Sequence, residues 1–102
     1  MINKVKTQIG DLPIYWRDSI KTEDEGSDGP AGRFYYLDYA IEVNKGMPLG
    51  LKQQTVLHEL IHMIQYNAGL GRDELQADTY STNLLHLFKT NPKLVEFLLR
   101  KE

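Results

Sequence analysis

The first half of the chain alternates hydrophobic and polar residues, which is the period of a β-strand. The clearest run is Phe34 to Asn44, where one face carries Tyr35, Leu37, Tyr39, Ile41 and Val43. This run predicts a single strand whose apolar face packs on a layer of helices. Weaker alternation over residues 2–9 and a β-type composition over 14–17 predict two more strands, separated by a turn at 10–13.

After Pro48 the apolar residues recur every three to four positions, which is the helical period. Residues 49–68 predict a long, central helix that ends near Gly69, and about 73–89 predict a second helix with Asp73 as its N-cap. Asn91-Pro92 predicts the start of a third, short helix. The expected fold class is α+β: a small three-stranded, mainly antiparallel sheet packed on the first long helix, on the second helix, which carries Glu74, and on the short C-terminal helix. Leu94, Val95, Leu98 and Leu99 are expected to form the packing face of that third helix.

Between these halves, residues 22–33 (T-E-D-E-G-S-D-G-P-A-G-R) are acidic, rich in glycine and almost free of apolar side chains. Such a segment cannot contribute to a core, so it predicts a surface loop. A plain connector is favoured over a flap beside a binding cleft, since loops are generally solvated and variable.

Length and composition then narrow the function classes. The chain has 102 residues, which suits one domain over 1–102, with strands and loops in 1–48 and helices in 49–102. A net charge of −2 gives no basic field for nucleic acid. There is no cysteine, which excludes disulfides, a cysteine zinc site and a thiol nucleophile. No signal peptide and no membrane-spanning run is recognised, so we expect a cytoplasmic protein with a peptide or protein partner.

The chemistry is concentrated in His58-Glu59-Leu60-Ile61-His62, an H-E-x-x-H sequence within the first helical segment. Histidines four residues apart on a helix project from one face, about one turn apart, and can bind one metal ion. The glutamate beside the first histidine is then close enough to act on a metal-bound water. An apolar helix with two histidines and no metal is the plain alternative, but unpaired polar groups there are costly.

Catalytic zinc sites use three protein ligands, so a third ligand must follow. At about 100° per residue, Asp78 lies about 40° from Glu74 on the second helix, whereas His86 lies about 120° away and three turns along. Glu74 is the preferred third ligand because of its longer reach. Asp78 then becomes an outer partner that accepts a hydrogen bond from one ligand histidine. The opposite assignment, with Asp78 as the ligand, stays open.

The pairing of H-E-x-x-H with Glu74-Leu-Gln-Ala-Asp78 resembles the gluzincin metallopeptidases. The run E-L-Q-A-D-T-Y-S-T-N-L-L (74–85) resembles the ImmA/IrrE-like metallo-endopeptidases, in particular small phage-related members and single-domain minigluzincins. The resemblance covers about residues 34–100. It implies Zn²⁺ held by His58, His62 and Glu74, with Glu59 as general base in peptide hydrolysis. It also implies a protein substrate such as a phage or prophage repressor.

The expected function is therefore a zinc-dependent endopeptidase whose extended substrate pairs with an exposed edge of the sheet, the strand at 34–44. The alternative is a latent or inactive zinc-binding domain that works by contact, as an antirepressor would. An oxyanion donor is also required. The sequence leaves five candidates for it: Tyr35, Tyr36, Tyr66, Tyr80 and His86.

Overall fold

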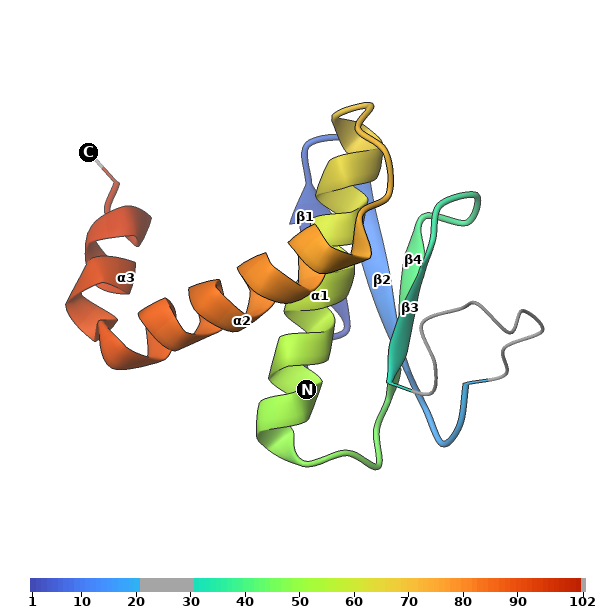
Figure 1. Cartoon of the computed structure of the whole chain (residues 1–102), viewed down its shortest axis with the longest axis horizontal. Coiled ribbons are helices and arrows are strands. Elements are labelled where there is room, and N and C mark those ends of the chain that lie inside the picture. The colour runs from blue at the N-terminus through green and yellow to red at the C-terminus, as the bar shows by residue number, and fades with distance from the viewer. Residues whose placement is uncertain (21–30, 102) are drawn as a thin grey trace.

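The computed structural model describes residues 1–20 and 31–101 and confirms the α+β class (Figure 1). Its elements, in chain order, are β1 (Lys4–Thr7), β2 (Gly10–Arg17), β3 (Gly32–Tyr35), β4 (Ala40–Asn44), α1 (Leu49–Asn67), α2 (Glu74–Thr90) and α3 (Pro92–Leu99). Helix α1 packs on one face of the sheet, and α2 crosses α1 and leads to α3 in an arm that extends away from the strands (Figure 1).

The sheet has four strands in the order β1-β2-β4-β3, not the three predicted. Strands β2 and β4 are parallel, whereas the β1–β2 and β3–β4 pairs are antiparallel. The sheet is thus mixed, and within residues 1–20 and 31–101 its edge strands are β1 and β3. The part of the predicted 22–33 loop from 22 to 30 lies outside the described residues, and Gly32 and Arg33 belong to β3.

The prediction of one strand over 34–44 is wrong, because a turn at 36–39 divides it into β3 and β4. Leu37 is 85% exposed in this turn, and Tyr35 lies on the face away from α1, while Ile41 and Val43 face α1 as predicted. The turn contains no glycine or proline, so nothing in the alternation marks it. Tyr39 adopts a left-handed φ of 49°, and its hydroxyl bonds to Thr7 Oγ1 at 2.7 Å, a contact made 32 residues away. Tertiary contacts therefore help to hold the turn.

The turn between β1 and β2 also differs from the predicted one. The turn falls at Gln8 and Ile9, and β2 begins at Gly10, which takes a φ of +138° that favours glycine. The predicted turn at 10–13 instead forms the first half of β2, whose Leu12 pairs with Val5 and is fully buried. A proline at position 13 suggested a break, but it pairs with Lys4 within the ladder.

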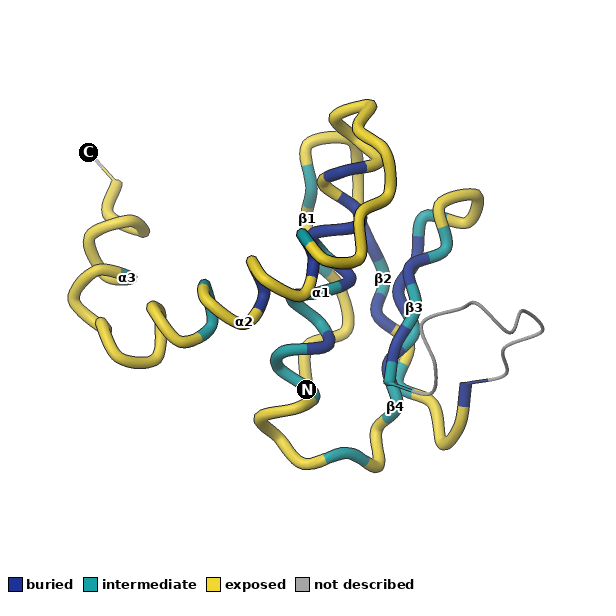
Figure 2. The backbone as a smooth tube through the Cα atoms, viewed as in Figure 1, coloured by how far each residue is buried: buried dark blue, intermediate teal, exposed yellow. Residues whose placement is uncertain are grey.

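The core lies between the inner face of the sheet and α1. Its buried members are contributed by β2, β3, β4 and α1: Leu12, Ile14, Phe34, Ile41, Val43 and Met63. Figure 2 shows this burial concentrated in the strands and along one side of α1, while the arm of α2 and α3 is almost entirely exposed. The core thus supports α1 along the side next to the sheet, and α1 carries the H-E-x-x-H sequence.

Two local signals fix how α2 leaves α1. Gly69 has a φ of +71°, and the Leu70 and Gly69 amides donate to Gln65 O and Tyr66 O, which is a Schellman ending just beyond the C-cap Ala68. Asp73 caps α2 as predicted, accepting from the Gln76 amide at 2.9 Å. The connection between the two helices is therefore short, so the first turn of α2 is held beside the last turns of α1.

The third helix begins at Pro92 as predicted, but it does not pack as predicted. None of its residues is buried, and Phe97, Leu98 and Leu99 stand largely exposed. Among the described residues, no helix is long and apolar enough to cross a membrane.

Candidate metal centre

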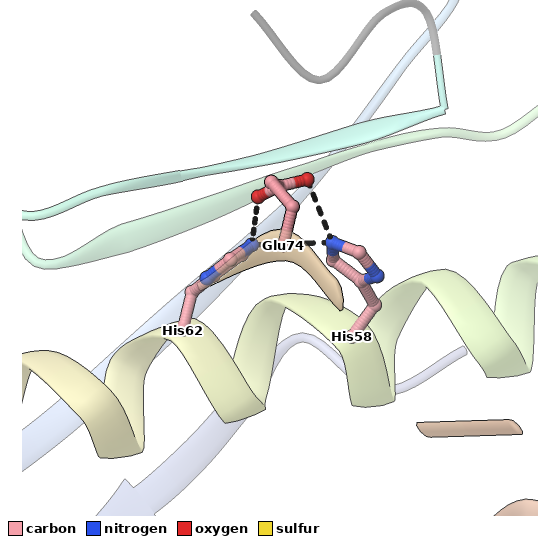
Figure 3. Close-up of side chains that lie close together, drawn as sticks. All are labelled: His58, His62 and Glu74. Atoms are coloured by element: carbon pink, nitrogen blue, oxygen red, sulfur yellow. Dashed lines mark hydrogen bonds and ion pairs between the residues drawn. The ribbon is translucent and has the colours of Figure 1, made fainter. Parts of the chain in front are cut away.

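Three side chains converge where α2 begins beside α1 (Figure 3). His58 Nε2 and His62 Nε2 lie 3.2 Å apart, and the Glu74 carboxylate spans both rings. One carboxylate oxygen contacts His62 Nε2, and the other lies 3.5 Å from His58 Nε2. The three predicted ligands are thus brought together, and their donor atoms lie within 4.8 Å of one another, close enough to bind a metal ion.

The remaining ring nitrogens each have a partner. His58 Nδ1 lies 2.8 Å from Asp78 Oδ1, and His62 Nδ1 lies 2.8 Å from Gln65 Oε1. A carboxylate and an amide carbonyl both accept hydrogen bonds, so each Nδ1 is the atom that carries a proton. A neutral ring with its proton at Nδ1 presents a lone pair at Nε2. Asp78 therefore lies where the predicted outer partner of His58 would lie, and Gln65 has the equivalent position beside His62.

This donor set fits a bound cation. Two lone pairs that face each other at 3.2 Å repel unless a proton or a metal ion lies between them. Zinc–nitrogen distances of about 2.0–2.1 Å at a tetrahedral angle place two ligand nitrogens ~3.3 Å apart. The observed separation therefore matches one shared ion. Arg72 reaches Glu74 Oε1 at 3.2 Å, which offsets the carboxylate charge but does not satisfy the nitrogen lone pairs.

Glu59 lies beside this site and inside the protein. Its residue is 2% exposed, and its Oε2 lies 4.0 Å from His58 Nε2. It lines an open cleft of about 250 Å³ together with His58, Glu74, Asp78, Thr55 and Gly32. The predicted base, two of the three predicted ligands and the predicted outer partner therefore share one cleft.

Gly32 was not anticipated from the sequence. A Cβ at this position would overlap Thr55 Cγ2 and would lie 3.1 Å from the Glu42 carbonyl oxygen and 3.5 Å from Glu59 Cγ. The absent side chain lets edge strand β3 approach α1 next to Glu59. In the sequence, Gly32 sits at the end of a glycine-rich segment, where nothing distinguishes it from its neighbours.

The five candidate oxyanion donors lie in different parts of the structure. Tyr36 and Tyr66 line a small cavity with His62, and their rings lie 5.7 Å apart between centroids. Tyr80 and His86 are exposed on α2. Tyr35 lies on the outer face of the sheet, where its hydroxyl donates to Glu42 Oε1. Of the five, Tyr36 and Tyr66 therefore line a cavity with a metal-ligand candidate.

Tyr35 belongs to a second polar cluster, which we call the outer-face cluster: Tyr35, Glu42 and Arg17. Arg17 Nε donates to Glu42 Oε2 at 2.7 Å. Burial, the hydrogen bond to Glu42 and the charge of Glu42 raise the pKa of Tyr35 to about 12. Burial alone would raise the pKa of Glu42, but the hydrogen bonds from Tyr35 and Arg17 and the Arg17 charge lower it overall.

Comparisons of the chain with known protein families, with curated proteins and with solved structures found no match.

Proposed function

We propose that this protein is a zinc-dependent peptidase in which His58, His62 and Glu74 hold the ion and Glu59 is the general base. The observation that carries the proposal is the convergence of two Nε2 lone pairs and one carboxylate beside a buried glutamate. Two imidazoles and a carboxylate, with a position left open, are the ligands of catalytic zinc in several hydrolases. The same donors also accept Mn²⁺, Co²⁺ or Ni²⁺, so the metal itself has to be measured.

Glu59 has the surroundings that a base for this reaction needs. A bound zinc ion would polarise a carbonyl group and would lower the pKa of a bound water to about 7. The Glu59 carboxylate would accept the proton of the attacking water and pass it to the leaving amine. It lines the cleft within 4.0 Å of a ligand nitrogen. This position lets it reach a water that also faces the metal, without itself being a ligand.

An extended peptide would bind along β3. This strand pairs with β4 on one side and forms an edge of the sheet, while Gly32 and the neighbouring Ala31 line the cleft. An exposed edge accepts an extended segment through main-chain hydrogen bonds. The sequence predicted that the substrate pairs with the strand at 34–44. Within that segment only β3 can do so, because β4 is flanked by β2 and β3. A repressor as the natural substrate remains a suggestion of the family resemblance alone.

The experiment compares the zinc-loaded protein with Glu59→Gln on a proteome-derived peptide library, scored by new N-termini. Glutamine keeps the size of Glu59 but cannot take up the proton, so this variant should retain zinc and lose cleavage. Asp73→Asn is a matched control, because it also neutralises one carboxylate and leaves a good N-cap. Equal cleavage by Glu59→Gln would refute the role of Glu59. If the wild type binds zinc but cleaves nothing, the protein is a metal-binding interaction module.

A further inference from the structure

We propose that Gln65 is a positioning residue that sets the tautomer of His62 and holds the start of α2 so that Glu74 meets both histidines. The inference rests on the proposed metal site. It goes further by assigning one carboxamide the task of linking the second ligand to the third. Gln65 does not line the cleft that contains Glu59, but it lines the small cavity with His62, Tyr36 and Tyr66.

Gln65 is buried, at 2% exposure, between the last turns of α1 and the start of α2. Its Oε1 accepts from His62 Nδ1 at 2.8 Å and from the Asp73 amide at 3.4 Å. Its Nε2 donates to the Asp73 carbonyl oxygen at 3.1 Å and to Gln76 Oε1 at 2.7 Å. The two contacts with the Asp73 backbone fix which end of the carboxamide faces His62, since oxygen accepts and nitrogen donates.

No other side chain of this length reproduces the set. Glutamate accepts hydrogen bonds but donates none, so it would face the Asp73 carbonyl and Gln76 Oε1 with lone pairs. Methionine has the same reach but no strong donor or acceptor. Asparagine is one methylene shorter. A buried polar group that loses its partners is destabilising, so Gln76 and His62 would both be affected by these changes.

The link has a direct consequence for the ligands. With an acceptor at Nδ1, the neutral His62 ring keeps its Nε2 lone pair directed at His58 and Glu74. Without it, the proton is free to move to Nε2, and that tautomer cannot bind a metal through Nε2. Glu74 follows directly after Asp73, so the backbone bonds of Gln65 also fix the residue next to the third ligand.

The test uses metal-free protein and three variants. Nitrogen-15 spectra of the histidine rings, taken well above the ordinary histidine pKa of ~6.5, report which ring nitrogen carries the proton. Gln65→Met removes both functions, and Gln65→Glu keeps the acceptor toward His62 but loses the donors toward α2. Gln54→Met is the matched control, because Gln54 lines the cleft and also bridges α1 and α2, but its hydrogen bond goes to Thr82 Oγ1 at 2.9 Å. Zinc affinity is measured on the same proteins by chelator competition.

In the wild type, Gln65→Glu and Gln54→Met we expect His62 to be protonated at Nδ1, and in Gln65→Met we expect a mixture rich in the Nε2–H form. Zinc affinity should fall by about 10- to 100-fold in Gln65→Met, fall in Gln65→Glu, and stay near wild type in Gln54→Met. An unchanged tautomer and affinity in Gln65→Met would overturn the proposal. If that variant does not fold, an unchanged affinity in Gln65→Glu overturns the link to Glu74.

The tautomer readout separates this proposal from the metal site itself. Failure of the wild type to bind zinc would remove the proposed function, yet the His62 spectrum would still decide whether Gln65 selects the tautomer. An Nε2–H form of His62 in the wild type would overturn that role by itself.

Discussion

Two polar clusters lie on opposite sides of β3 and β4. The metal cluster of His58, His62 and Glu74 belongs to α1 and α2, on the helix side of the sheet, and the outer-face cluster of Tyr35, Glu42 and Arg17 covers the other face. Both are networks around a carboxylate. In the outer-face cluster, Arg17 supplies the positive charge and Tyr35 supplies a second donor, so Glu42 is satisfied by its own neighbours.

The metal cluster is built differently, because its inner atoms are acceptors. The protons of both rings are directed outward, to Asp78 and Gln65, and the two Nε2 atoms face each other at 3.2 Å. Arg72 contacts Glu74 from the exposed side. The difference suggests that a self-compensated cluster serves stability, whereas a convergent set of lone pairs calls for a cation from outside.

The largest effect is expected for His62→Ala. It removes a buried ligand, so zinc binding should be lost by far more than the ~10- to 100-fold typical of an outer partner. Zinc at about 100 times its dissociation constant should stabilise the wild type by about 2.7 kcal/mol and leave this variant unchanged. Thermal unfolding with and without zinc measures both. An equal zinc-induced rise in Tm for His62→Ala would show that the ion binds elsewhere.

Glu74→Gln tests the choice of the third ligand against its neighbour. The amide is a poor zinc ligand, so the affinity for zinc should fall strongly, with less effect than loss of a histidine. Asp73→Asn should change the affinity little, because asparagine is also a good N-cap. Calorimetric titration of the two variants with zinc measures both affinities. The reverse order of affinities would move the ligand role away from Glu74.

The smallest effect is expected in the outer-face cluster. The folded-state pKa of Glu42 is lowered, so its contribution to stability is present above the unfolded value of ~4.3 and is lost as pH falls through the folded pKa. Glu42→Gln should therefore reduce the free energy of unfolding by about 1 kcal/mol at neutral pH and hardly at all at strongly acidic pH. Urea unfolding at the two pH values measures this difference. A zinc-dependent change in this difference would contradict the separation of the two clusters.

Helices and site were more predictable from sequence than the sheet. The helix starts follow from Asp73 and Pro92, whose local chemistry acts within one turn. The spacing of His58 and His62, and the shared face of Glu74 and Asp78, are fixed by helical geometry and only needed the two helices to meet. Gln65 follows His62 by three residues, so helical geometry places it on the same side of α1. Its backbone partners at Asp73 depend on the fold and leave no signal in the sequence.

The strand predictions were wrong where long-range contacts determine the turns and the strand pairing. The turn at 36–39 lacks glycine and proline, and Tyr39 takes its φ with help from a bond to Thr7. Strands β2 and β4 lie on either side of a segment with no apolar pattern. No local sequence signal therefore indicates that the two strands pair in parallel. For the same reason the role of Gly32 depends on Thr55 and Glu59, which approach it only in the folded chain.

The central claim is that His58, His62 and Glu74 together form one metal site. Native mass spectrometry of metal-free protein, titrated with zinc beside the double variant His58→Ala/His62→Ala, tests it most directly. The account predicts one zinc ion per chain in the wild type and none in the double variant under the same conditions. No zinc in the wild type, or one ion retained by the double variant, would contradict it.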